Sequence, residues 1–261
     1  MKLLKEHYTL HEFKNPGPLL RRLYRIVRTT LCPGMSYRFF LQFYLNSDPH
    51  CMQITFLRAD GMDVGFFTCT YSFQQLVNRK TVVCRVAIGI IDTYQQGAMP
   101  FAALCRRIIA YKLGHPFRPV YMVAYLANPF VYSAIARNVA EFWPNRKKHT
   151  PSSILDLKEN ILTVGNLKKH EVKPFILKIH FHVLLPDVLR KRIYASEDAD
   201  VLFYLKINPE FENQMGVMTI VPVKWGNVLA NIWKAMVVRP LKKHRFWSNL
   251  AIETLIDIFR S

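Results

Sequence analysis

The sequence has 261 residues, enough for a single domain with additions. Hydrophobic residues make up 51% of it and aromatic residues 13%, so the chain can bury a core, which excludes a disordered protein. Lysine and arginine outnumber acidic residues by 36 to 18, a formal net charge of +18. This charge favours an anionic partner but does not choose among nucleic acid, an anionic membrane, a phosphorylated cofactor and an acidic protein.

Cysteine usage and the first residues bear on the compartment. The five cysteines are scattered and contain no Cys-x-x-Cys pair, as is typical of reduced thiols. Charged residues near the N-terminus fall where a secretory signal needs an apolar run. Residues 119–136 carry no charge, but Asn128 and Pro129 interrupt them, which favours a strand followed by a helix. We therefore expect a soluble, cytoplasmic protein without a transmembrane span.

The first 45 residues have a helical pattern. Residues 15–18 (Asn-Pro-Gly-Pro) form a start signal, after which apolar residues share one face and Arg21, Arg25 and Arg28 share another. A Cys-Pro-Gly stop at residues 32–34 separates this helix from a second, aromatic run at residues 37–45. The pattern predicts a pair of helices.

The next elements are strands. Residues 52–59, 64–73 and 81–94 are rich in β-branched and aromatic residues, and an Asp-Gly turn follows the first run. They predict a three-stranded antiparallel meander. A helix should then begin near Pro100 and end at Gly114, because both its start and its stop are marked.

The second half alternates strand and helix before it becomes basic. Residues 119–127 predict a buried strand, and Asn128 with Pro129 predicts the cap and first position of a helix reaching about residue 142. Further predictions are a short strand at 173–185, a strand pair at 201–207 and 217–223, and C-terminal helices. We expect one domain over residues 1–261, with a basic insertion at 144–197 and a helical extension at 225–261.

This order of elements resembles the fold of the GCN5-related N-acetyltransferase (GNAT) superfamily over residues 15–143 and 200–224. In that superfamily the pattern Q/R-x-x-G-x-G/A joins the strand to the central helix, and its amides hold the pyrophosphate of acyl-CoA. The matching segment here is residues 94–99, Tyr-Gln-Gln-Gly-Ala-Met, between a strand and a helix. The resemblance implies an α/β (α+β) fold with a mixed central sheet, an antiparallel meander followed by β-α-β-α.

The resemblance also implies a site. Acetyl-CoA or another acyl-CoA would lie between the strand ending at Asp92 and the strand ending at Ala127. An amine acceptor of unknown identity would attack directly, without a covalent enzyme intermediate. Asp92 is the candidate base and Tyr132 a substitute candidate for the acid. The candidate cofactor-binding residues are Gln95, Gln96, Gly97, Ala98, Met99, Asn128 and Arg106.

Each candidate also has a purely structural interpretation. Asp92 is compatible with an ordinary aspartate at a strand end, and Tyr132 with a core residue of an amphipathic helix. Gly97 is compatible with a turn that binds no ligand, and Arg106 with a solvated helix face. Three positions differ from the family pattern: Tyr94 replaces Gln or Arg, Met99 replaces a small residue, and Pro100 removes an amide N–H. Because of the last two, a rival hypothesis remains open, in which a GNAT-like fold without catalysis binds an acidic protein, a membrane surface or nucleic acid.

Other constellations give weaker signals. His180 and His182 share one strand face near His170, but no carboxylate or cysteine completes a zinc site, so we expect no metal. The sequence has neither a G-x-S-x-G elbow nor a G-x-x-x-x-G-K-[ST] loop. Basic clusters at 145–149, 166–170, 189–192 and 239–247 are compatible with an anionic surface as partner. A different α+β fold is the third possibility, and a structure without a splay between the two central parallel strands would favour it.

Overall fold

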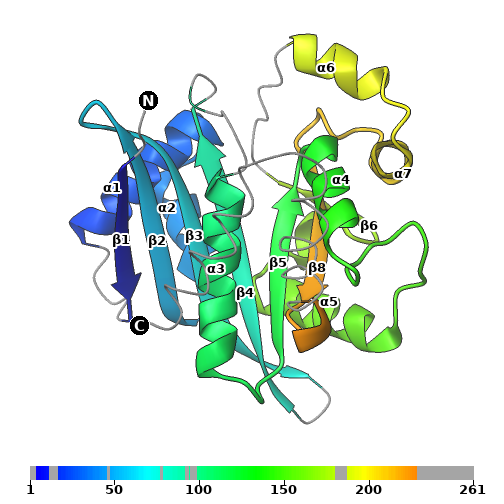
Figure 1. Cartoon of the computed structure of the whole chain (residues 1–261), viewed down its shortest axis with the longest axis horizontal. Helices are drawn as coiled ribbons and strands as arrows, with labels where there is room; N and C mark the ends of the chain where they lie inside the picture. The colour runs from blue at the N-terminus through cyan, green and yellow to red at the C-terminus, as the bar shows by residue number, and fades with distance from the viewer. Residues whose placement is uncertain are drawn as a thin grey trace, which may run out of the picture.

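A mixed eight-stranded sheet forms the centre of the computed structural model, which describes residues 4–11, 17–45, 48–76, 79–91, 94, 99–179 and 187–227. The strand order is β1-β2-β3-β4-β5-β8-β7-β6 (Figure 1). The strands are β1 (Leu4–Leu10), β2 (Pro49–Ala59), β3 (Met62–Leu76), β4 (Arg79–Ile90), β5 (Val120–Leu126), β6 (Glu171–Lys173), β7 (Ile176–Lys178) and β8 (Met215–Pro222). Among these strands, β4 and β5 alone pair in parallel.

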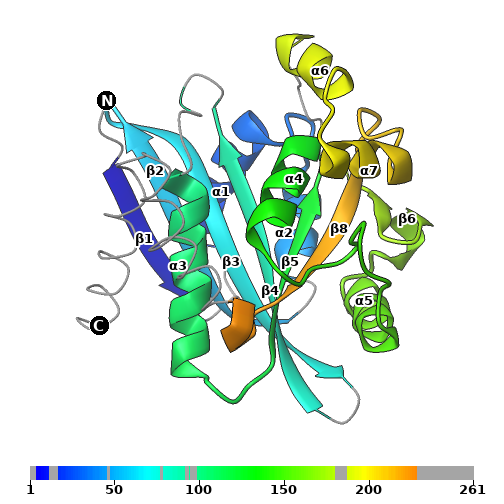
Figure 2. The same ribbon diagram turned by 45° about the vertical axis from the view of Figure 1, so that its right-hand side comes forward.

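Helices cover both faces of the sheet. One face carries α1 (Pro18–Thr30), α2 (Tyr37–Leu45) and α5 (Ser152–Val164), and the other carries α3 (Met99–Gly114), α4 (Pro129–Asn138) and α7 (Ala199–Ile207) (Figures 1 and 2). Two further helices are α6 (Asp187–Tyr194) and the short 3-10 helix η2 (Lys168–His170). Among the described residues, no helix is both long and apolar enough to cross a membrane.

The central strands are buried because helices pack on both of their sides. On β4, residues 82–84 form a continuous apolar run with at most 1% of each residue exposed. Val82 and Cys84 belong to the core beneath α3 and α4, whereas Val83 faces α5. A run without polar alternation is what a strand covered on both faces requires.

The predicted central topology is confirmed. The meander β2-β3-β4 is antiparallel, turns at Asp60 and Gly61 with positive φ angles of 50° and 78°, and leads through α3 to the parallel strand β5. Helix α4 and strand β8 then complete the order that the resemblance to the GNAT superfamily implies. The fold is therefore a GNAT-like mixed sheet.

Two predicted elements are wrong. Residues 4–10 form an edge strand paired with β2, although the first 45 residues were expected to be helical. Residues 201–207 form helix α7 instead of a strand, and β8 pairs with β5 and β7. The apolar run of α7 is too short for its periodicity to distinguish a helix from a strand. The Asp198 carboxylate accepts hydrogen bonds from the backbone amides of Asp200 and Val201, and this N-cap stabilises the helix.

The basic segment 144–197 extends the sheet and covers it. Its hairpin β6-β7 adds two short strands beside β8, and α5 packs Ile154, Leu157 and Ile161 on the sheet. The predicted strand at 173–185 is thus shorter in the described residues, ending at Lys178. Residues 228–261, with most of the predicted C-terminal helices, lie outside the described residues.

Candidate acyl-CoA site at the splayed strands

Strands β4 and β5 pair over only part of their lengths. Their parallel register runs from Val82 and Val120 to Val86 and Ala124, yet β4 continues to Ile90 and β5 to Leu126. Beyond this point Ala87 to Gly89 have partners on β3 but none on β5. Figures 1 and 2 show the two strands diverging toward their carboxyl ends. The sheet therefore has the splay that the acyltransferase hypothesis requires.

Helix α3 begins beside this splay. It starts at Met99, has Pro100 in its first turn and ends at Gly114, as predicted. The N-terminus of a helix of 16 residues attracts anions through its unpaired amides and its dipole, although Pro100 contributes no N–H. Asp92 and residues 95–98, which contain Gln95, Gln96, Gly97 and Ala98, lie outside the described residues, and so does the side chain of Met99. Their roles in cofactor binding and catalysis stay predictions.

Asn128 lies at the end of β5 and caps α4. Its side-chain oxygen accepts a hydrogen bond of 2.9 Å from the Phe130 amide, and Pro129 occupies the first turn. This cap was predicted from the Asn-Pro pair. The cap uses the oxygen of the side chain, so the Nδ2 donor is the part of Asn128 available for a ligand. Its cofactor contact stays a prediction.

Tyr132 is part of the core of α4. The residue is fully buried, and its hydroxyl donates a 2.8 Å hydrogen bond to the Pro144 carbonyl. Burial raises its pKa, with a further increase from the nearby Asp200 carboxylate. An acid role for this hydroxyl would require the bond to Pro144 to be exchanged for one to the substrate.

Tyr204 of α7 lies next to the splay, a position that the sequence analysis did not predict. Its buried hydroxyl donates to the carbonyl of Leu126, the last residue of β5, at 2.9 Å. Asn208 donates in turn to the same hydroxyl at 3.2 Å, and burial raises the Tyr204 pKa. Because residues 201–207 were predicted as a strand, no signal placed this side chain at the end of β5.

Arg106 and Arg107 lie further along α3, partly buried. Arg106 comes seven residues after Met99, which places it about 10 Å along the helix axis from the first turn. The carbonyl of Arg107 accepts a 3.4 Å hydrogen bond from Tyr71. The predicted phosphate contact of Arg106 stays a prediction.

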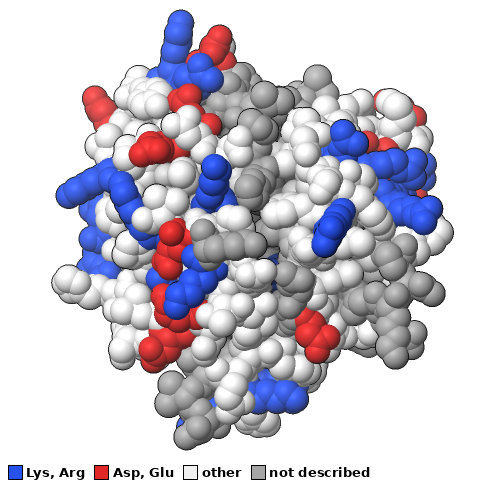
Figure 3. Space-filling view, turned by 180° about the vertical axis from the view of Figure 1, so that it is seen from behind, with Lys and Arg blue, Asp and Glu red and all other residues white. Residues whose placement is uncertain are grey.

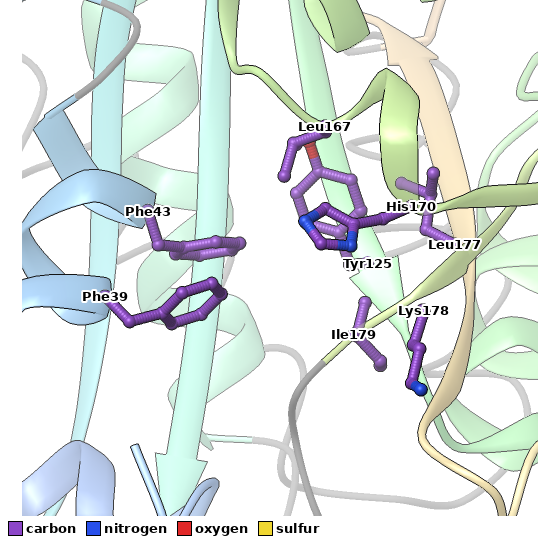
Figure 4. Close-up of a pocket in the computed structure, with 8 residues that line it drawn as sticks. All are labelled: Phe39, Phe43, Tyr125, Leu167, His170, Leu177, Lys178 and Ile179. Carbon is purple, nitrogen blue, oxygen red and sulfur yellow. The ribbon is translucent and has the colours of Figure 1, made fainter. Parts of the chain in front are cut away.

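A small apolar pocket lies on the opposite face of the sheet, between α2 and the segment from η2 to β7. Tyr125 of β5, the first residue beyond the part of that strand that pairs with β4, contributes to it (Figure 4). The Tyr125 hydroxyl is buried and has no hydrogen-bond partner among the described residues, and burial raises its pKa. The pocket is lined by Phe39, Phe43, Tyr125, Leu167, His170, Leu177, Lys178 and Ile179. The sequence analysis did not predict it, because its residues come from four separate segments.

The other sequence candidates do not gather into a second site. In the part of the chain that the structure describes, no three histidine, cysteine or acidic side chains could hold a metal, and His180 and His182 lie outside it. In three of the basic clusters, Arg146, Lys168 and Arg190 form ion pairs with carboxylates. The cluster at 239–247 is not described. Figure 3 accordingly shows basic and acidic side chains interspersed over the back of the molecule.

Comparisons with known proteins identify no close relative. No protein-family model matches the sequence, and no curated protein matches it. Among solved structures, an acetyl-CoA complex of NAA60 from Arabidopsis thaliana is 17% identical, with a TM-score of 0.36, over 57% of this chain and 94% of the other.

Two bacterial structures match a similar part of the chain. A GNAT family acetyltransferase from Elizabethkingia anophelis with acetyl-CoA bound is 10% identical, with a TM-score of 0.33, over 54% of this chain and 86% of the other. A protein from Enterococcus faecalis described as a probable N-acyltransferase is 10% identical, with a TM-score of 0.36, over 52% of this chain. The match spans only 32% of the length of the Enterococcus protein.

Proposed function

We propose that this protein binds acyl-CoA between β4 and β5 and transfers the acyl group to an amine acceptor. The observation that carries the proposal is the end of β4-β5 pairing at Val86 and Ala124, beside the N-terminus of α3. Parallel strands that separate leave backbone donors and acceptors for an extended ligand, and a helix N-terminus attracts its phosphates. Acetyl-CoA is the simplest candidate for the acyl donor, and the proposal specifies the acceptor only as an amine.

The residues present suit such a ligand. Within the described residues, the segment from Ala87 to Gly89 has no pairing with β5, so those of its backbone groups that face β5 are available to the amide-bearing arm of CoA. The predicted loop at 95–98 and the first turn of α3 would take the pyrophosphate, with Arg106 further along the helix. Asn128 would contribute its Nδ2 from the end of β5.

Acyl-CoA supplies an activated acyl group as a thioester. Asp92 lies two residues after the end of β4 in the chain and would accept the proton that the amine loses as it is acylated. Among the described residues, Tyr132 is the candidate for donating a proton to the leaving thiolate, provided that its hydroxyl gives up its hydrogen bond to the Pro144 carbonyl. The chain would thus provide proton transfer and positioning.

A screen of amines with acetyl-CoA, read by release of the CoA thiol, tests the transfer. We expect Asp92→Asn to lower kcat by about 100-fold, because it removes the proton acceptor, whereas Asp156→Asn on the exposed face of α5 leaves kcat unchanged. Full activity of Asp92→Asn would remove Asp92 from the mechanism.

The variant Tyr132→Phe separates a catalytic from a structural role of that residue. Loss of the buried hydrogen bond to Pro144 costs about 1 kcal/mol of stability in either case. A catalytic hydroxyl adds a fall in kcat of about 100-fold, measured well below the unfolding temperature. An unchanged kcat would assign Tyr132 to the core alone.

Two observations favour a second candidate function, in which the fold binds a ligand without transfer. Pro100 removes an amide from the first turn of α3, and the hydroxyl of Tyr132 already has a protein acceptor. Absence of CoA binding, or binding of CoA without acylation of any amine, would support this candidate and contradict the transfer.

A further inference from the structure

The end of the molecule opposite the carboxyl ends of β4 and β5 exposes large apolar side chains. Phe117 is 98% exposed, and Leu113 and Trp225 are each 38% exposed. The β3-β4 hairpin, the loop after α3 and the end of β8 lie together at the lower end of Figures 1 and 2. An exposed cluster of this kind marks an interaction surface more often than a lone apolar side chain does.

A buried cation holds Phe117 in this position. The ammonium group of Lys112, in a residue only 6% exposed, donates to the carbonyls of Pro116 and Arg118 at 2.8 and 2.7 Å. These two residues flank Phe117, so the loop is fixed on both sides of an exposed ring. The Lys112 ammonium also lies 5.9 Å from the ring centre of Trp225, which connects the loop to the chain after β8.

The surroundings of Phe117 are basic. Arg79 and Lys80 are exposed at the start of β4, and Lys80 and Arg118 lie over the ring of Phe73 at 4.0 and 5.2 Å. Segments 79–82, 111–119 and 223–227 contain no aspartate or glutamate. Lys224 is paired with Glu141, but within the described residues Arg79, Lys80 and Arg118 form no ion pair with a carboxylate.

We propose that this end of the molecule docks on an anionic membrane surface. Phe117 enters the headgroup region, Leu113 and Trp225 lie at its boundary, and Arg79, Lys80 and Arg118 meet lipid phosphates. Aromatic side chains favour the interface between water and lipid, and each lysine or arginine near an anionic leaflet strengthens binding. The aliphatic side chain of Leu113 and the projecting ring of Phe117 suit a lipid boundary better than a stacked base.

Docking at this end leaves the splay open. β4 and β5 begin at the docking end, whereas the splay lies at their carboxyl ends, so a ligand enters the splay away from the lipid. Docking on a membrane therefore does not depend on acyl transfer.

Flotation of the full-length protein with lipid vesicles tests the proposal, with phosphatidylcholine alone compared with a mixture containing phosphatidylserine. We expect binding only to the mixed vesicles, weakened by salt. Phe117→Ser should reduce binding by about ten-fold, because it removes the apolar anchor. Val188→Ser, which replaces a side chain 72% exposed on α6, is the matched control and should bind as the wild type does.

A pair of charge variants separates this surface from the general positive charge. Arg79→Glu with Lys80→Glu should lower binding by about ten-fold or more, whereas Lys147→Glu with Lys148→Glu changes the net charge equally and should leave it unaltered. Equal loss in both double variants, or equal binding to both kinds of vesicle, would overturn the proposal. Binding of a labelled single-stranded oligonucleotide that depends on Phe117, without vesicle binding, would overturn it in favour of nucleic acid.

Discussion

Arg85 shows how one side chain fixes the position of a helix. It extends from β4 and is only 8% exposed. Its Nη1 and Nη2 donate to the carbonyls of Phe43 and Tyr44 at 2.9 and 3.0 Å, in the last turn of α2. The final carbonyls of a helix have no partners within the helix, so the guanidinium both caps α2 and ties it to the sheet.

Arg85→Leu should destabilise the protein by about 3 kcal/mol, because it removes two hydrogen bonds from a charged donor to carbonyls in the last turn of α2. Arg85→Lys should give a smaller loss of stability than Arg85→Leu, because the ammonium group is still a charged donor. Some loss should remain, since an ammonium group cannot reproduce the two-pronged geometry. Urea unfolding measures both, with Arg79→Leu on the exposed start of β4 as the control. An unchanged midpoint for Arg85→Leu would show that α2 needs no cap from β4.

At the scale of single residues, the sequence predicts local interactions better than distant ones. The Asn128 cap was predictable because its partner is two residues away. The partner of Tyr132 is twelve residues away and that of Tyr204 is 78 residues away, so neither bond leaves a local pattern. The strand-to-loop candidates at 92 and 95–98 were chosen by resemblance, and the described structure does not include them.

Among the elements, β1 depends most clearly on electrostatics. Its Glu6 accepts hydrogen bonds from Arg22 of α1 at 2.8 Å and from Arg58 of β2 at 2.5 Å. Arg22 also forms a two-pronged pair with Asp63 at the start of β3. Most of β1 is exposed, so these bonds and its pairing with β2 hold it in place.

Acid should weaken the attachment of β1. Hydrogen bonds from Arg22 and then Arg58 lower the Glu6 pKa from 4.5 to about 2. Because the folded-state pKa lies below the unfolded value, the stabilising contribution is complete above about pH 4.5 and is lost as the pH falls toward 2. The melting temperatures of the wild type and Glu6→Gln should therefore differ above this range and converge below it.

Thermal unfolding at a series of pH values measures this convergence. Glu197→Gln replaces an exposed carboxylate and serves as the control, which should follow the wild type throughout. A constant difference between the wild type and Glu6→Gln from pH 4.5 to 2 would contradict the assigned role of Glu6.

Strand β1 also shows why some elements could not be predicted from the sequence. Five of the seven residues of β1 are exposed, so its period of two buries no apolar face and gives no strong signal. The meander was predictable because its three strands are apolar and the turn at Asp60 and Gly61 has a sequence signature. Helix α7 was missed because apolar residues occupy nearly all of its positions, a pattern shared by buried strands and helices.

For the whole molecule, the order of elements predicted more than any motif did. Segment 94–99 departs from the acyltransferase pattern, yet the sheet separates where that fold requires it. The position at which β4 and β5 separate follows from pairing between segments that are distant in the sequence, and no residue of either strand predicts it. Phe117 likewise follows a helix stop in the sequence, and only the packing of Lys112 shows that its ring is held outward.

Titration calorimetry of the full-length protein with acetyl-CoA and CoA at two salt concentrations tests the proposal that acyl-CoA occupies the splay between β4 and β5. We predict saturable binding that Gly97→Trp abolishes by filling the predicted pyrophosphate loop. Gly34→Trp should bind normally, since Gly34 lies in the loop after α1 and no atom lies within 4 Å of a Cβ built at that position. Absence of binding, or weak binding that salt removes equally from the wild type and both variants, would contradict the claim.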